Sequence, residues 1–343
     1  MMWLRRVILF SSIFSLIIGL ILGLSRSNFW EILQSISQHH FLIMSGSFFG
    51  TLITLERIVT IKHKWTHFLP LLNGSSIVFF LLGNEELAVF MLFVGAFVML
   101  IMYSMFWWQH RDIIHSLFVL SGICYGIAIF YAYRSDLSSS VRFFELFFLI
   151  TIVAERLELA RFINVPEYFK KGLLLSILVL MVVSFYYKWN EIYGVVISLM
   201  ALGLIQYDIA KKNIQSKEPH RFRGWALMIG YYWLFIHGVS FLIPNVLTYD
   251  IQIHTFFLGF VMNMVFAHVT IILPAVLKIQ YNVNTKVYYI IWVLFQIVLL
   301  YRFITYRFFF QSIFFFNLCE CDCGCVVFCC KYYLLNKKQS GKK

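Results

Sequence analysis

Two histidines, His254 and His268, stand in one long apolar run that extends from Tyr249 to Lys278. On a helix, with about 100° and ~1.5 Å per residue, their spacing of fourteen residues brings the two imidazoles to within roughly 40° of one another and separates them by about 21 Å along the axis. Both side chains therefore lie on one face, one near each side of a membrane. Because ionisable side chains at membrane depth are candidates for function, this spacing favours either two stacked metal or haem sites or two steps of a proton path.

A second apolar run, HHFLIMSGSFFGTLITLERIV from His39, contributes His40 and, one turn later, Met44. The loop charges indicate that this run and the run from Tyr249 both begin on the outer side of the membrane. We therefore expect His40 and His254 at similar depth near the outer face. Imidazole suits haem iron and copper, and a thioether is a soft ligand for copper. Each histidine could instead be a hydrogen-bonded interior residue or line a water-filled cavity, and this alternative stays open.

The other histidines divide by position in the chain. His237 is in the middle of an apolar run that ends at Pro244, and it should lie between the two levels. Four more stand beside Lys or Arg in short loops, and we interpret them as interfacial residues: His63, His67, His110 and His220.

Charged residues inside two of the apolar runs form a second candidate group. One set ends the run from His39, and the other lies in FFLITIVAERLELARF, where positions three apart are neighbours on a helix. Unpaired charges at that depth are costly, so we expect pairing between the two runs. The group would then be an ion-pair network that holds two helices together, or else a proton route or a clamp on an anionic group such as a haem propionate. Its members are Glu56, Arg57, Glu155, Arg156, Glu158 and Arg161.

The composition indicates a polytopic membrane protein, since 61% of the 343 residues are hydrophobic and only 13% are charged. The apolar start after Arg5 and Arg6 is interpreted as a first membrane helix, because no small-residue cleavage site of a signal peptide follows it. The formal net charge of +12 does not indicate a nucleic-acid partner, because most Lys and Arg residues fall in alternate short loops. We interpret the positive charge as a consequence of membrane topology and of contact with anionic membrane lipids.

Apolar runs of about 20 residues predict an all-α helical bundle of about twelve transmembrane helices with a cytoplasmic N-terminus. We expect one membrane domain over residues 1–305, followed in residues 306–343 by a last helix of undefined extent and a Cys/Lys-rich tail. Six of the seven cysteines lie in this tail with alternate spacing rather than Cys-x-x-Cys, so we expect neither a zinc site nor a disulfide framework. The predicted spans are 7–24, 40–61, 67–83, 87–108, 113–132, 143–163, 170–187, 191–208, 224–243, 251–277 and 286–305, with a candidate twelfth from Phe308.

Four segments carry a family resemblance that extends to about Arg302: HFLIM with GSFFGTLITLER, AERLELARF, GYYWLFIHG and DIQIHTFFLGFVMNMVFAHVTIILPAVL. Together they resemble the NnrS-type family of twelve-span membrane proteins and its bacterial relatives. The resemblance implies haem and copper, a link to nitric-oxide stress or denitrification, and His40, His254 and His268 as the motif histidines. The adjacent histidine pair and the His-Pro-Glu-type motif of haem–copper oxidases are missing, which argues against an oxygen-reducing binuclear centre of that kind.

We therefore expect a protein of the bacterial inner membrane that binds haem, and in one version copper, through His40, His254 and His268, with Met44 as a further metal ligand. Its expected role is in nitric-oxide or respiratory stress, with a respiratory-chain or electron-transfer protein as partner, and whether it is an enzyme stays open. One alternative is a proton-coupled transporter or channel in which the histidines and the glutamates of the charged group line a polar path. Another is a structural subunit of a respiratory complex.

Overall fold

The computed structural model describes residues 2–26, 33–59, 66, 68–159, 165–243, 247–277 and 285–308. Within these ranges the secondary structure is helical and contains no strand, so the predicted all-α class is confirmed. The cysteine-rich tail and the candidate twelfth span lie outside the described residues, apart from the end of the last helix at Phe308.

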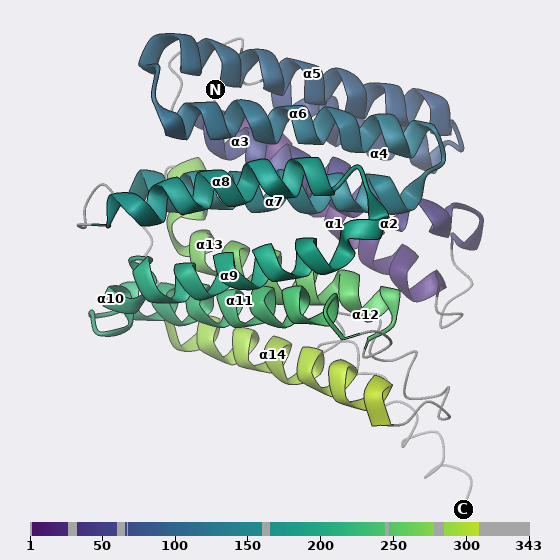
Figure 1. The fold of residues 1–343 in the computed structure, drawn as a ribbon. Coiled ribbons are helices and arrows are strands. Elements are labelled where there is room, and N and C mark those ends of the chain that lie inside the picture. The colour runs from purple at the N-terminus through teal and green to yellow at the C-terminus, as the bar shows by residue number, and fades with distance from the viewer. Residues whose placement is uncertain are drawn as a thin grey trace, which may run out of the picture.

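The helices follow one another with short connections, and two rods are composite (Figure 1). The first composite rod joins η1 (Gln34–His39), α2 (His40–Leu42), η2 (Ile43–Gly50) and α3 (Thr51–Val59), and the second joins α12 (Tyr249–His254), η6 (Thr255–Val261) and α13 (Met262–Leu277). The other helices are α1 (Met2–Arg26), α4 (Leu69–Leu81), α5 (Glu85–His110), α6 (Ile113–Tyr133), α7 (Leu137–Leu159), α8 (Glu167–Val183), η5 (Tyr187–Trp189), α9 (Asn190–Tyr207), α10 (Ala210–Ile214), α11 (His220–Ser240) and α14 (Thr285–Phe308).

Eight helices in the described ranges are long and apolar enough to cross a membrane, which makes this a membrane protein. They are Trp3–Arg26, Gln34–Ile58, Glu85–His110, Ile113–Tyr133, Leu137–Leu159, Asn190–Tyr207, Tyr249–Ile271 and Thr285–Ile304. Each of the eleven predicted spans overlaps one helical rod, but α4 and α8 have only 13 and 17 residues. The count of about twelve crossings and the cytoplasmic N-terminus stay predictions.

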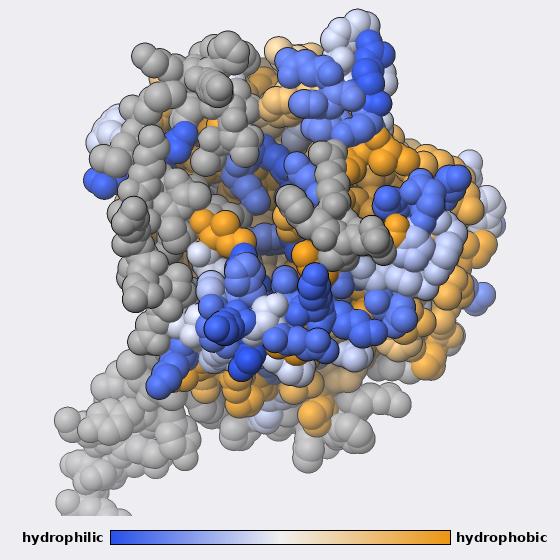
Figure 2. Space-filling view, turned by 90° about the vertical axis from the view of Figure 1, so that its left-hand side faces the viewer, coloured by the Kyte–Doolittle hydropathy of each residue, from blue (hydrophilic) through white to orange (hydrophobic). Residues whose placement is uncertain are grey.

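The rods lie side by side with their axes roughly aligned, so the bundle has two distinct ends (Figure 1). The start of α12, with Asp250, lies at one end, which we call the acidic end. The short helix α10, with Lys211 and Lys212, lies at the other, which we call the basic end. Figure 2 looks onto the basic end, where hydrophilic side chains gather and hydrophobic ones occupy the flanks of the bundle.

Both histidine-bearing rods contain a π-helical segment, η2 in the first and η6 in the second. Short π-helical segments are rare and occur frequently at functional sites. Glycines allow close packing at both: a Cβ at Gly46 would lie 2.8 Å from a methyl group of Leu92, and one at Gly259 would lie 2.7 Å from the Cβ of Trp233. The apolar periodicity of the sequence does not predict this change in helical pitch.

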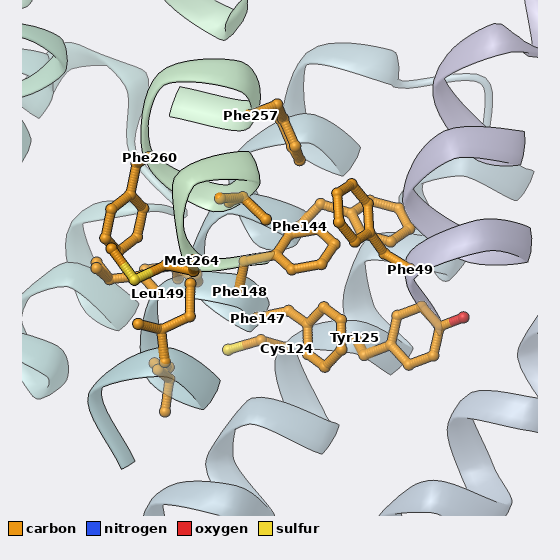
Figure 3. Packing of buried hydrophobic residues seen from close by; sticks show 14 of the residues in the cluster. Phe49, Cys124, Tyr125, Phe144, Phe147, Phe148, Leu149, Phe257, Phe260 and Met264 are labelled. Atoms are coloured by element: carbon orange, nitrogen blue, oxygen red, sulfur yellow. The ribbon is translucent and has the colours of Figure 1, made fainter. Parts of the chain in front are cut away.

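Helix α7 lies at the centre of the bundle, with nearly all of its side chains buried. Its Phe144 and Phe148 contact the two composite rods: ring centroids are 5.1 Å apart for Phe49–Phe148 and 5.6 Å apart for Phe148–Phe257 (Figure 3). Phe41 joins this group, 5.2 Å from Phe144. We call these five phenylalanines the aromatic layer, and they separate the cavities described next.

Candidate functional site

A cavity of about 180 Å³ at the acidic end is lined by His40, Met44 and His254. We call it the histidine cavity. Its other polar lining residues include Arg26 from the end of α1 and Asp250 from α12. The structure therefore brings together the two histidines that the sequence placed at similar depth, together with the methionine one turn from His40. His268 does not line this cavity in the described part of the chain.

The imidazole of His40 is held against α1 by its Nδ1 atom, which lies 2.6 Å from the carbonyl oxygen of Gly19. A carbonyl oxygen only accepts, so Nδ1 carries the proton and the lone pair is on Nε2. Two glycines of α1 make room for this arrangement: a Cβ at Gly23 would lie 3.1 Å from Cε1 of His40, and one at Gly19 would clash with the sulfur of Met44.

His254 is held in the same way, with Nδ1 2.7 Å from the carbonyl oxygen of Asp250. Nη2 of Arg302 also lies 3.2 Å from this Nδ1, but the shorter contact with the carbonyl oxygen places the proton on Nδ1 and the lone pair on Nε2. Arg302 donates from Nη2 to the Asp250 carboxylate at 2.7 Å and thereby ties α14 to this turn of α12. A donated Nδ1–H that fixes the ring and its tautomer is the outer-shell pattern of metal-binding histidines.

No group of three or more His, Cys, Asp and Glu side chains is placed to hold a metal ion within the described ranges. A metal held by His40 and His254 would therefore need another type of third ligand. Met44 and Met262 both line the same cavity, and Met44 is the nearer of the two to His40 in the chain. Two imidazoles and one thioether are a ligand set that suits copper.

A second cavity of about 120 Å³, which we call the inner cavity, lies on the other side of the aromatic layer. It is mostly apolar, and its polar side chains include Glu56, Glu155 and His268. Phe49 lines both this cavity and the histidine cavity, so the two cavities are neighbours. The tenth predicted span thus lines both of these cavities along its length.

The charged residues of the second and sixth predicted spans pair with one another. Arg57 donates from Nη2 to Glu155 at 2.7 Å and from Nη1 to Glu158 at 3.3 Å. Its guanidinium also lies over the ring of Phe118, 3.9 Å from the centroid. This group therefore joins α3 to α7. Arg161, the last member of the predicted group, lies outside the described residues.

His268 has a different partner from the other two motif histidines. Its Nε2 atom is in hydrogen-bond contact with Nη2 of Arg156. A guanidinium only donates, so Nε2 must accept, and its lone pair is already used. In this arrangement His268 has no lone pair to offer a metal. A metal-ligand role for His268 would require this contact with Arg156 to break, and that role stays a prediction.

Sequence reasoning missed a buried polar group beside the histidine cavity. Tyr193 donates to Glu145 at 2.9 Å, and the other oxygen of Glu145 is 3.6 Å from Nε2 of His237. Arg142 covers the ring of Tyr193 at 4.1 Å from the centroid. Glu145 also lines an open pocket of about 580 Å³ at the acidic end. The available signal was a lone carboxylate in the apolar segment FFELFF, three residues after Arg142.

These features define a class of protein: a helical membrane protein that keeps histidine, arginine and carboxylate side chains inside the bundle. Residues 5–311 match the family model described as "Domain of unknown function (DUF8744)", so the chain belongs to that family. Neither the curated proteins nor the solved structures contain a match.

Proposed function

We propose that this protein binds a redox-active metal at the histidine cavity, with Nε2 of His40 and Nε2 of His254 as ligands and Met44 as the third. The observation that carries the proposal is the matched pair of backbone contacts that hold both imidazoles at this cavity in the same tautomer. Orientation of a ligand by its second nitrogen is a feature of metal sites that single buried histidines do not need.

The dimensions of the cavity favour a copper ion over haem. Pockets for cofactors and small molecules have volumes of roughly 300–1,000 Å³, whereas this cavity has about 180 Å³. A single ion with the two imidazoles and the thioether fits that space. Haem ligation by the same two histidines requires the aromatic layer to open, with Phe49 and Phe257 displaced, because both line the cavity. Haem therefore stays the second version of this proposal.

The physiological role we propose follows the family resemblance: nitric-oxide or respiratory stress in the inner membrane of a bacterium. A bound copper ion or haem would supply a centre for one-electron chemistry and for binding of a small diatomic ligand. An electron-transfer partner would then dock at the acidic end, where the cavity lies.

The test is metal analysis and an optical spectrum of the detergent-purified protein. We expect about one equivalent of copper in the wild-type chain and loss of this metal in His40→Ala and His254→Ala. His110→Ala is the matched control, because His110 is exposed at the end of α5. A Soret band would instead indicate that the same residues bind haem rather than copper. A protein with neither metal after reconstitution contradicts the proposal.

A specific observation also favours a second candidate, the proton-coupled transporter or channel. Consecutive cavities share lining residues: Phe49 joins the histidine and inner cavities, and His268 joins the inner cavity to a further one at the basic end. Titratable side chains therefore line successive spaces along the bundle. Proton flux into proteoliposomes that is lost in His268→Ala and kept in His110→Ala supports this candidate, and equal flux in both variants excludes it.

A further inference from the structure

The cavity at the basic end, of about 190 Å³, has a different chemistry from the other two. We call it the arginine cavity. The end of α7 contributes Arg156, the start of α11 contributes His220 and Arg223, and α10 contributes Asn213. No carboxylate lines it in the described part of the chain. Two guanidinium groups therefore line this cavity, and no anionic side chain of the described residues does.

Both arginines have donors without an acceptor in the described part of the chain. The Nε atoms of Arg156 and Arg223 are buried and make no hydrogen bond there. Arg156 is only 3% exposed, and Arg223 uses Nη2 on Nδ1 of His220 at 2.9 Å. Leaving a buried charged donor unpaired is costly, so buried donors nearly always find a partner. An anionic oxygen in the cavity would accept from both.

Nearby carboxylates attract Arg156, but none forms an ion pair with Arg156 or Arg223 in the described part of the chain. The two guanidinium groups are near enough to repel each other electrostatically. Asp208 interacts with Arg156, but it does not line the cavity, and its carboxylate accepts from the backbone N–H of Ala210 at 2.8 Å. Glu155 pairs with Arg57.

His220 also lines the cavity and contacts one of the two arginines. Its Nδ1 accepts from Nη2 of Arg223 at 2.9 Å, so in this arrangement the ring is not doubly protonated, and burial and then Arg223 lower the pKa of His220. Two guanidinium groups and no carboxylate thus line the cavity in the described part of the chain, and such a lining attracts anions.

Where the cavity reaches the surface of the bundle, its lining is apolar. Leu159 and Ile271 line it and are 39% and 47% exposed. Both residues lie near the ends of helices that are long and apolar enough to cross a membrane. The opening therefore combines a cationic interior with a surface that suits acyl chains. Phospholipid headgroups bind basic pockets of this kind between membrane helices.

We propose that Arg156 and Arg223 bind a phosphate group in the arginine cavity, carried either by an anionic phospholipid or by a soluble phosphate. The two guanidinium groups would donate charge-assisted hydrogen bonds to the phosphate oxygens, as arginine does in phosphate sites. This site lies at the opposite end of the bundle from the histidine cavity, and it does not depend on a metal there.

The test compares Arg156→Gln and Arg223→Gln with the matched control Arg221→Gln. Arg221 lies on the same turn of α11 but is exposed, does not line the cavity, and donates to the carbonyl oxygen of Ser216 at 3.1 Å. Bound lipid is counted by native mass spectrometry after equilibration in bilayer nanodiscs of phosphatidylglycerol and phosphatidylcholine. A second arm titrates inorganic phosphate into the delipidated protein and follows its melting temperature.

We expect phosphatidylglycerol to be retained over phosphatidylcholine by wild type and Arg221→Gln, and each cavity variant to bind it about tenfold more weakly. If inorganic phosphate alone shows that difference, the ligand is a soluble phosphate. Equal retention and equal phosphate response in all four proteins overturn the proposal. Should Arg156→Gln fail to fold, the half-buried Arg223 provides the same comparison alone, with Arg223→Lys expected to restore part of the affinity.

Discussion

The rod α12–η6–α13 carries one histidine toward each end of the bundle, and the two imidazoles make different hydrogen bonds. At the acidic end His254 donates Nδ1–H to a backbone carbonyl and keeps its Nε2 lone pair. Near the basic end His268 gives its Nε2 lone pair to Arg156. The hydrogen-bond partner of an imidazole, rather than its depth in a membrane, therefore decides whether it is available as a ligand.

The largest expected effect tests this difference between the two ends. In His254→Ala the cavity loses one of two imidazole ligands, so we expect metal content to fall to background. In His268→Ala we expect metal content to stay at the wild-type level, because this histidine does not line the histidine cavity. Metal analysis of the two purified variants checks the prediction, and equal loss in both would assign His268 to the same site.

The next effect concerns the charges near the inner cavity. Replacing Arg57 by Met leaves the buried carboxylate of Glu155 without its cation, and we expect a loss of about 3–5 kcal/mol in the free energy of unfolding. Glu158→Gln is the matched control, because this side chain is 44% exposed and its contact with Arg57 is longer, so its loss should be less than ~1 kcal/mol. Denaturant unfolding in detergent measures both, and similar losses would contradict the pairing.

A smaller effect is expected where η6 packs on α11. Gly259→Ala places a Cβ against Trp233 and should cost about 1–3 kcal/mol through overpacking. Gly126→Ala, where an added Cβ meets nothing within 4 Å, is the control and should be neutral or slightly stabilising. Melting temperatures of the two variants check the prediction. A neutral Gly259→Ala would mean that the π-helical segment is not tightly packed there.

The smallest effect is expected at the buried group that includes Glu145. Tyr193→Phe removes the hydroxyl that donates to this carboxylate, at an expected cost of about 0.5–1.5 kcal/mol, the net contribution of one hydrogen bond. Tyr168→Phe, at an exposed tyrosine pair, should cost almost nothing. The same unfolding assay measures both, and an equal effect would show that Glu145 does not depend on Tyr193.

The sequence predicted the helices and the relative depth of some site residues because both follow from local patterns. Hydropathy and loop charge assign runs to spans and give their direction. Two spans that begin on the same side must place His40 and His254 at one level. The same reasoning placed Arg57 and the glutamates of α7 near the other end, where the structure pairs them.

The other features of the site depend on which helices are neighbours, and hydropathy does not contain that information. The contact between His237 and Glu145 joins α11 to α7, and the tyrosine that completes the group comes from α9. The arginine cavity needs α10 and the start of α11, which the sequence presented only as a basic loop. The contact of His268 with Arg156 decides a tautomer, which is a property of side-chain geometry rather than of spacing.

The proposed metal site at the acidic end consists of His40, His254 and Met44. X-ray absorption at the copper K-edge of the copper-reconstituted protein tests it most directly. We expect two imidazole nitrogens and one sulfur around the metal in wild type, and loss of the imidazole signal in the His40→Ala/His254→Ala double variant. A sulfur-only environment, or a spectrum unchanged in that variant, would contradict it.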